Sequence, residues 1–298
     1  LQGQTTGNLT HIKTYLNGSL DKLTELSEKN DTVTGLTTGF IDLDKHMSGL
    51  IAPDLIVIAA RPGMGKTSFA VNIAQNAAIK AKVPVAIFNL EMTGEQLATR
   101  MLSGEARVSS RRLRDGDLKD DDWPLIGEAI SRLSETEIYI DDTRGITVTE
   151  IAARCKKLKM ERGLGLVVID YIQLIKGSRR DGNRRLEIEE ITRSLKILAK
   201  DLNVPLIALS QLSRAVEKEK REEKRPKLSD LRESGSIEQD ADIVMFLHRP
   251  GKDDPSVEEP NKAICIIEKF RNGEPGDIPL TWLGEFTKFG NWSGSREQ

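Results

Sequence analysis

Apolar segments of strand length alternate with helical segments along most of this chain. From about residue 31 onward we expect seven strand cores, at residues 55–60, 84–90, 137–141, 166–170, 204–210, 242–248 and 262–269. Several are apolar at every position, as strands are when helices cover both faces of a sheet. Residues 188–202 instead repeat apolar side chains at steps of three and four, as an amphipathic helix does. The pattern predicts an α/β fold with a largely parallel central sheet and helices on both faces.

The first 30 residues are expected to form a separate unit. Apolar side chains recur at steps of three and four from Leu9 to Leu26, which predicts one apolar stripe on a helix. A polar, turn-rich segment follows at residues 27–39. We therefore expect a protruding helix and connector over residues 1–30 and one large domain over residues 31–298. The stripe is expected to dock on a body, either that of its own chain or that of a neighbour.

The amino-acid composition limits the kinds of binding partner and the cellular compartment that we expect. The 44 basic and 46 acidic side chains give a net charge of −2, so any polyanion must bind through local basic patches. Neither a membrane span nor a signal peptide is expected. Cys155 and Cys265 lie on apolar stretches without metal-binding or redox spacing, which indicates inert thiols in a reducing cytosol. Because the chain begins with Leu1 rather than methionine, we expect it to be a fragment.

The segment "ARPGMGKTS", residues 60–68, joins the first apolar strand to a helix. It matches the phosphate-loop pattern GxxxxGK[ST], with Ala60 in place of the first glycine. Between a strand and a helix, the loop amides and the helix N-terminus point at one anion. We expect Lys66 to reach the β and γ phosphates of ATP and the Thr67 hydroxyl to hold Mg²⁺. The loop residues expected to bind the nucleotide are Arg61, Pro62, Gly63, Met64, Gly65, Lys66, Thr67 and Ser68.

Polar side chains close three of the apolar strands. Glu91 follows "AIFNL", Asp170 ends "LVVID" and Gln211 follows "IALS". A carboxylate at the end of an apolar strand requires compensation of its charge, and a nucleotide–metal site supplies it. We expect Asp170 to hold Mg²⁺, Glu91 to act as the general base for the attacking water, and Gln211 to bind the γ phosphate. Arg100 on the following helix is a weaker candidate for the same pocket, with ordinary helix surface as the alternative.

Six segments together resemble one protein family. They are "ARPGMGKTS", "FNLEM", "VVIDYIQLI", "ALSQLSR", "LRESGSIEQDADIV" and "KFRNGEPG". Over residues 31 to about 292 the chain resembles the C-terminal motor domain of the bacterial replicative DNA helicase, the DnaB family, and its leading helix resembles that family's linker helix. The resemblance implies a RecA-like P-loop NTPase fold, a homohexameric ring around single-stranded DNA, and 5′ to 3′ ATP-driven unwinding of forked DNA. It also implies primase and a helicase loader as partners of the full-length protein.

The resemblance further implies that Arg232, Glu233 and Gly235 line the DNA channel. Two basic runs are additional candidates for DNA contact because they follow Asp170 and Gln211 closely in the chain. Residues 213–227 carry seven basic and four acidic side chains. Residues 176–185 carry five basic and one acidic side chain, including four arginines at Arg179, Arg180, Arg184 and Arg185. Solvated surface is the alternative for both runs.

The segment "KFRNG" predicts a hairpin, because an Asn-Gly pair follows an apolar strand. Lys269 and Arg271 would lie at or near its tip. The resemblance implies that both reach the γ phosphate held by the adjacent subunit, which would make them catalytic in trans. Ordinary hairpin surface is the alternative.

Two other functions fit parts of the pattern. A RecA-type recombinase or a KaiC-like ATPase would share the fold and the phosphate loop, but "LRESGSIEQDADIV" and "KFRNG" favour the helicase. The second alternative is a ring that uses ATP to assemble and binds DNA without moving along it. Strand displacement on a forked substrate separates that ring from a motor.

Overall fold

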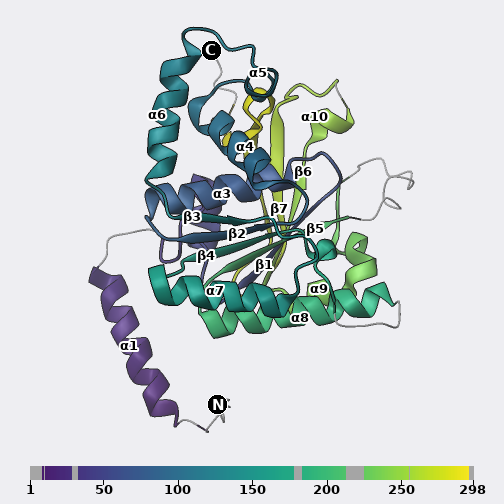
Figure 1. Ribbon diagram of the computed structural model, residues 1–298. Coiled ribbons are helices and arrows are strands. Elements are labelled where there is room, and N and C mark those ends of the chain that lie inside the picture. Colours follow the sequence, from purple (N-terminus) through teal and green to yellow (C-terminus); the bar gives the residue numbers. More distant parts are fainter. Residues whose placement is uncertain are drawn as a thin grey trace.

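The structure is a computed structural model that describes residues 9, 11–28, 33–177, 183–212, 225–254 and 256–294. Within these residues, nine strands form one sheet in the order β3-β2-β4-β5-β1-β6-β7-β8-β9 (Figure 1). The strands are β1 Leu55–Ala60, β2 Val85–Asn89, β3 Ile138–Asp141, β4 Leu166–Asp170, β5 Leu206–Gln211, β6 Ile243–His248, β7 Lys262–Phe270, β8 Gly276–Leu283 and β9 Lys288–Asn291.

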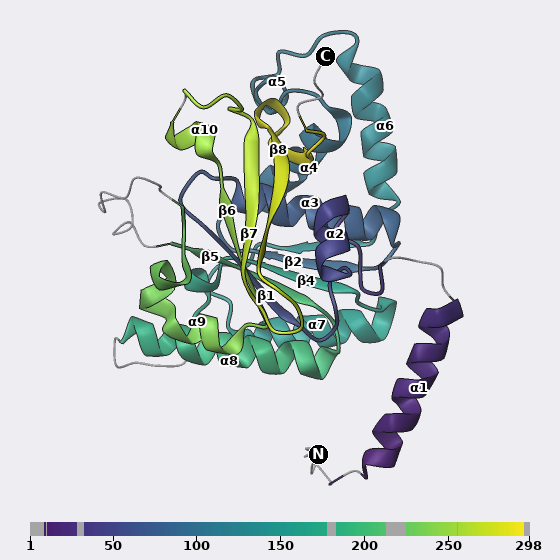
Figure 2. The same cartoon turned by 180° about the vertical axis from the view of Figure 1, so that it is seen from behind.

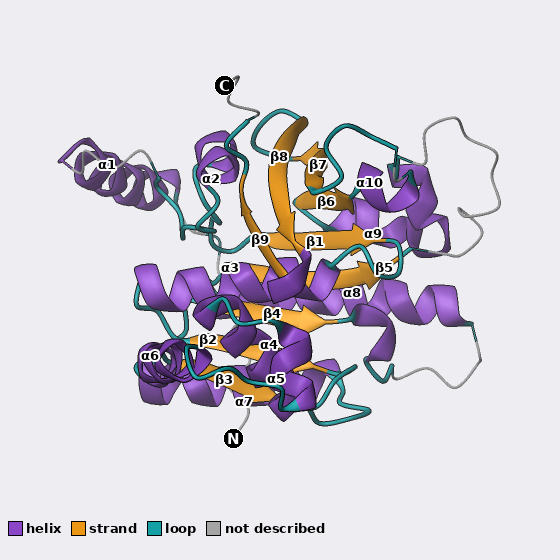
Figure 3. Cartoon of the chain, turned by 90° about the horizontal axis from the view of Figure 1, so that it is seen from above, coloured by secondary structure: helices purple, strands orange, loops and turns teal. Residues whose placement is uncertain are grey.

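The sheet has a parallel part and an antiparallel part. All neighbours from β3 to β6 pair in parallel, whereas β6, β7, β8 and β9 pair antiparallel. Figure 3 shows the parallel strands side by side, from β3 to β1. All seven predicted strands are present, and the largely parallel α/β fold is confirmed. The prediction missed β8 and β9, in which few side chains are fully buried and where Pro279 interrupts the strand pattern.

Helices cover both faces of the sheet. In Figures 1 and 2, α3 and α4 lie on one face and α7 and α8 on the other. Side chains of β1 alternate between two buried clusters, with Ile56 and Ile58 facing α3 and Leu55 and Val57 facing α8. The helices are α1 Ile12–Glu28, α2 Ile41–Met47, α3 Lys66–Lys80, α4 Gly94–Ala106, α5 Ser110–Asp115, α6 Asp122–Ser134, α7 Val148–Arg162, α8 Arg184–Leu202, α9 Gly235–Asp240 and α10 Pro250–Asp253.

Helix α1 stands away from the sheet and its covering helices (Figures 1 and 2). Ile12, Leu16 and Leu20 are between 59% and 64% exposed, so the described part of the apolar stripe is uncovered. The side chains of Leu23 and Leu26, which complete the predicted stripe, lie outside the described part. The expected protruding helix is therefore present, and the described part of its stripe does not rest on this chain.

The two cysteines are core residues. Cys155 is 0% and Cys265 is 1% exposed, and neither forms a disulfide. Burial raises the pKa of each thiol to about 12, so both stay protonated and unreactive at neutral pH. Among the described helices, none combines the length and apolar character that a membrane crossing requires.

Candidate nucleotide-binding site

The carboxyl ends of the parallel strands bring the predicted site residues to one edge of the sheet. Ala60 pairs with Gln211 between β1 and β5, and Asn89 pairs with Asp170 between β2 and β4. Strands of matched register in a parallel sheet end together, so the loops that follow them meet there. The phosphate loop follows β1, and α3 begins directly after it at Lys66.

Gly65 makes the turn from the loop into α3. Its φ is 96°, which lies in the left-handed region that glycine adopts without strain. A Cβ atom at this position would also approach the Phe289 ring to 2.9 Å. The glycine therefore allows both the turn and the packing of β9 against the loop, and the amide groups at the start of α3 face the pocket.

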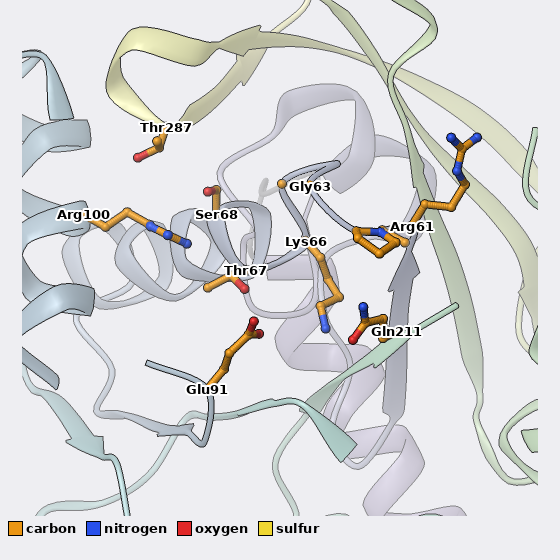
Figure 4. Close-up of a pocket in the computed structure, with 12 residues that line it drawn as sticks. Arg61, Gly63, Lys66, Thr67, Ser68, Glu91, Arg100, Gln211 and Thr287 are labelled. Carbon is orange, nitrogen blue, oxygen red and sulfur yellow. The ribbon is translucent and has the colours of Figure 1, made fainter. Parts of the chain in front are cut away.

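Nearly all predicted nucleotide-binding residues line one pocket, shown in Figure 4. Its lining consists of Ala60, Arg61, Pro62, Gly63, Gly65, Lys66, Thr67, Ser68, Glu91, Arg100, Gln211 and Thr287. Met64 does not contribute its side chain, which is 2% exposed in the core, and its N–H donates to the Arg61 carbonyl at 3.3 Å. The expectation that Met64 binds the nucleotide is thus not supported by its position. Thr287 was not predicted, because it comes from the antiparallel part of the sheet.

Asp170 lies beneath the phosphate loop and is 3% exposed. Its Oδ2 accepts a hydrogen bond from Thr67 Oγ1 at 2.5 Å, and its Oδ1 is 3.5 Å from Lys66 Nζ. Burial lowers the pKa of the Lys66 ammonium, while the charges of Asp170 and Glu91 act to raise it. Lys66, Asp170 and Glu91 therefore form a compact cluster of partly compensated charges, to which Thr67 is hydrogen-bonded.

The same cluster suits a magnesium ion. Asp170 Oδ1 is buried and accepts no hydrogen bond from any described residue, although it is a strong acceptor. Mg²⁺ prefers oxygen ligands and is usually held by one or two protein groups together with phosphates and water. The Thr67 hydroxyl and the Asp170 carboxylate fit that requirement. A cage of three or more His, Cys, Asp or Glu side chains does not occur among the described residues.

Glu91 and Arg100 approach the loop from the side of β2 and α4. In Figure 4 the Glu91 carboxylate points toward Thr67, and the Arg100 guanidinium points into the pocket. Burial lowers the pKa of Arg100, opposed by Asp170 and Glu91, yet arginine remains charged at neutral pH. Arg100 is therefore not ordinary helix surface. The pocket thus has an arginine of its own chain in addition to Lys66.

Arg61 turns away from the pocket centre (Figure 4). Its guanidinium forms an ion pair with Asp253 of α10, with NH2 at 2.7 Å from Oδ1. Lys252 of the same helix donates to the Gly63 carbonyl at 2.7 Å. These contacts hold the outer side of the phosphate loop. The prediction missed Lys252, which lies in α10 beyond the end of β6 and whose acceptor is a loop carbonyl far away in the chain.

Gln173 is a second residue that the prediction missed. It lies in a 3₁₀ turn, Ile172–Leu174, directly after Asp170. Its Nε2 donates to Ser210 Oγ at 3.0 Å and to the Gln211 carbonyl at 3.3 Å. Its own carbonyl accepts a hydrogen bond from Arg184. Gln173 thereby joins the ends of β4 and β5 to the start of α8.

The structure describes only some of the residues that were predicted to contact DNA. Arg179 and Arg180 lie outside the described residues, as do residues 213–224. Arg184 forms an ion pair with Glu187, and Arg185 is exposed at the start of α8. The backbone of Arg232 and Glu233 lies in a 3₁₀ turn, Leu228–Ser234, which leads into α9 at Gly235, but their side chains are outside the described part.

Lys269 and Arg271 lie at the amino-terminal ends of the parallel strands, opposite the phosphate loop. Phe270 pairs with Ile243, which in turn pairs with Ile56 near the start of β1. Lys269 is the penultimate residue of β7, and Arg271 follows the strand in the turn to β8, so the predicted hairpin is confirmed. Strand β1 has six residues, which at about 3.3 Å each separates this hairpin from the phosphate loop of the same chain by roughly 17 Å.

The fold and pocket define a P-loop nucleotide-binding domain with a RecA-like sheet. Residues 35–291 match the family of the DnaB-like helicase C terminal domain, and the chain belongs to this family. It is 50% identical over 97% of its length to the replicative DNA helicase DnaC of Bacillus subtilis, and equally to DnaB of Geobacillus stearothermophilus. The chain spans 64% of the length of each of these relatives.

Two solved structures are similar over nearly the whole chain. One is an ATPase domain with a TM-score of 0.90 at 35% identity, covering 96% of this chain and 100% of that one. A DnaB-like replicative helicase, described with its interactions with primase, has a TM-score of 0.86 at 36% identity over 92% of this chain and 68% of that one. The predicted family and fold are confirmed.

Two pocket variants should separate nucleotide binding from chemistry. Lys66→Ala removes the ammonium that is expected to neutralise the phosphates, so we expect ATP turnover to fall by at least about 10²-fold with an unchanged circular dichroism spectrum. Glu91→Gln keeps the size of the side chain but removes the base, so a fluorescent ATP analogue should still bind while hydrolysis nearly stops. Lys80→Ala, at the far end of α3, is the matched control and should behave like the parent. Near-parental turnover in Lys66→Ala would refute the assignment of the phosphate loop.

Proposed function

We propose that this chain is the ATP-driven motor domain of a replicative DNA helicase. The observation that carries the proposal is the cluster of Lys66, Thr67, Glu91 and Asp170 at the carboxyl ends of the strands, in a chain of the DnaB-like family. Its substrates are ATP and single-stranded or forked DNA. Translocation from 5′ to 3′ is part of the proposal and rests on family membership.

In the proposed mechanism each pocket residue acts on a different part of the reaction. Lys66 neutralises the charge that develops on the β and γ phosphates, and Gln211 donates a hydrogen bond to the γ phosphate. Glu91 orients the attacking water and accepts its proton. Thr67 and Asp170 would hold Mg²⁺, which supplies further neutralisation of the phosphate oxygens. Arg100 adds a fixed positive charge on the side of α4.

Forked DNA tests whether the chain is a motor. We expect ATP-dependent displacement of the paired strand from a forked duplex, lost in Glu91→Gln although that variant still binds ATP. Unpairing costs about 1.4 kcal/mol per base-pair step, which hydrolysis of one ATP per nucleotide or two readily supplies. If the parent hydrolyses ATP and binds single strands but never displaces the partner strand, the chain is the assembly ring that does not move.

The proposed assembly is a homohexameric ring. Support comes from α1, whose described apolar stripe is uncovered on its own chain and therefore requires an apolar surface on another subunit. Further support comes from Lys269 and Arg271, which are too far from the phosphate loop of their own chain. Primase and a loader remain proposed partners of the full-length protein.

DNA is proposed to bind the basic segments after β4 and β5 and the segment around Arg232. The proposed contacts are Arg179, Arg180, Arg184, Arg185, Arg232 and the Gly235 backbone, with Glu233 orienting a basic neighbour. The net charge of −2 excludes attraction by the whole molecule, so the contacts must be local. Binding through phosphates predicts little dependence on base sequence.

Salt dependence measures the number of phosphate contacts. With about three to five contacts per subunit, log affinity for single strands should fall against log salt concentration with a slope of roughly −0.7 per contact. Arg232→Ala should weaken binding equally for all sequences and make the slope shallower. The control is Arg111→Ala on α5, whose side chain is 84% exposed and pairs only with Asp115 among described residues. An unchanged slope in Arg232→Ala would remove Arg232 from the DNA contacts.

Mixed rings test whether Arg271 completes the pocket of a neighbour. Arg271→Ala and Glu91→Gln should each be nearly inactive, since an arginine finger contributes about 10³ to 10⁵ in rate. When mixed, some sites combine an intact pocket with an intact Arg271 of the adjacent subunit, so ATPase activity should partly return. The control mixes Glu91→Gln with Lys66→Ala, which both damage the pocket and should not complement. Full activity of Arg271→Ala alone, or no recovery in rings shown to be mixed, would contradict action in trans.

A further inference from the structure

Asp242 lies just before β6 at the amino edge of the sheet and is 4% exposed. Its Oδ2 accepts hydrogen bonds from Leu55 N at 2.7 Å and from Lys196 Nζ. Its Oδ1 accepts one from Arg271 NH1 at 3.2 Å, and its backbone carbonyl accepts one from Arg271 N at 3.0 Å. One buried carboxylate thus ties Arg271 to the first residue of β1 and to α8.

The carboxyl end of α9 provides the remaining anchors. The Gln239 carbonyl accepts a hydrogen bond from Arg271 NH2 at 3.0 Å. Lys269 Nζ donates to the carbonyls of Ala241, at 2.7 Å, and Glu238. The last carbonyls of a helix have no partner within the helix and carry partial negative charge, so they suit cations. Both basic side chains of the hairpin are therefore held by α9 and the residues that follow it.

We propose that Asp242 is a positioning residue for ATP hydrolysis, which aims Arg271 of its own chain at the nucleotide of the adjacent subunit. The proposal rests on the action of Arg271 in trans that is proposed above. Asp242 touches no substrate and acts through Arg271. The carbonyls of α9 do the same for Lys269.

The geometry of Arg271 fits this role. A guanidinium has five N–H donors in a fixed planar arrangement, and Arg271 uses NH1 and NH2 to bind its own chain. Its side chain is nevertheless 50% exposed, which leaves donors accessible to a phosphate oxygen. Two anchors, one at NH1 and one at NH2, fix both the direction and the rotation of the group. An arginine without them would lose side-chain entropy on reaching the phosphate.

A structural role is the competing explanation. Asp54 is 7% exposed beside Asp242, and its Oδ2 has no hydrogen-bond partner among the described residues. Burial and the charge of Asp242 raise the pKa of Asp54, while Lys196 and Arg271 act to lower it. Two carboxylates and two cations thus share this region. Loss of Asp242 could weaken the fold without any effect on positioning, so the test must separate the two.

Mixed rings separate the positioning role from the structural role, because loss of positioning damages only the site of the neighbouring subunit. Asp242→Asn keeps an acceptor for Leu55 N but no longer holds the guanidinium by charge. We expect kcat for ATP to fall about 10- to 100-fold, as misplaced catalytic groups do, with KM close to the parental value. Mixed with Glu91→Gln, Asp242→Asn should recover activity, because its intact pocket meets an intact Arg271. Mixed with Arg271→Ala it should not, since both variants damage the group that is delivered.

Each result decides the question. If Arg271→Ala and Glu91→Gln complement each other but Asp242→Asn and Glu91→Gln do not, the pocket of Asp242→Asn is itself damaged and the positioning role is wrong. A kcat of Asp242→Asn alone that equals the parental value would also contradict the positioning role. If Arg271→Ala and Glu91→Gln fail to complement, the assignment of Arg271 in trans is wrong and the role of Asp242 falls with it. Parent protein without ATPase activity would instead refute the proposed function.

A second variant covers the case in which Asp242→Asn leaves Lys196 unpaired and unfolds. Asp242→Asn/Lys196→Gln removes one anion and one cation together and still lacks the anchor for Arg271, so it should show the same complementation pattern. Lys196→Gln alone disturbs the same buried region but leaves the contact between Asp242 and Arg271 in place, so its thermal stability should fall while its kcat stays within about twofold of the parent. If the kcat of Lys196→Gln falls as much as that of Asp242→Asn, the region has a structural role and the positioning role is wrong.

Discussion

The buried carboxylate of Asp170 is the constraint on which the nucleotide pocket depends. A charge that is 3% exposed is unfavourable unless charged or polar groups compensate it, and here Lys66 and Thr67 do so. Because these two residues begin α3 while Asp170 ends β4, their attraction fixes the phosphate loop over the sheet. Gly65 allows the sharp turn that this placement needs. The same charges that stabilise the loop are those that phosphate and Mg²⁺ would engage.

The two ends of the parallel strands, the carboxyl edge and the amino edge of the sheet, carry different groups of charged residues. The phosphate loop after β1, Glu91 after β2 and Gln211 at the end of β5 line the pocket at the carboxyl edge, while Asp242, Lys269 and Arg271 gather at the amino edge. A cation at the amino edge cannot reach its own pocket, but it can reach that of a second copy placed edge to edge. In the proposed ring, each pocket would therefore depend on Arg271 of a neighbouring subunit. Arg100 adds positive charge to the pocket in cis, so the Arg271 proposed to act from a neighbour would lie beside a cation that the pocket's own chain supplies.

Patterns local in sequence predicted the parallel strands, the phosphate loop and the strand-end polar residues. Strands buried on both faces are apolar throughout, and the residues that close them stand out against that background. The partly buried β8 and β9 lack this contrast, and the side chain of Met64 packs in the core although the loop motif includes it. Gln173 and Lys252 were missed because their partners are backbone carbonyls far away in the chain. Such acceptors depend on tertiary structure and have no signature in the sequence.

Charge balance at the amino edge constrains how Arg271 can move. Asp54 and Asp242 face Lys196 and Arg271, so withdrawal of Arg271 would remove one of the cations that compensate two buried carboxylates. Such an imbalance is unfavourable in a region of low dielectric constant. The contacts of Arg271 and Lys269 with the Asp242 carboxylate and with the carbonyls at the end of α9 therefore tie α9 to the β7–β8 hairpin. Since α9 begins at Gly235, shortly after Arg232 and Glu233, the segment proposed to contact DNA is joined through α9 to the carbonyls that hold Lys269 and Arg271.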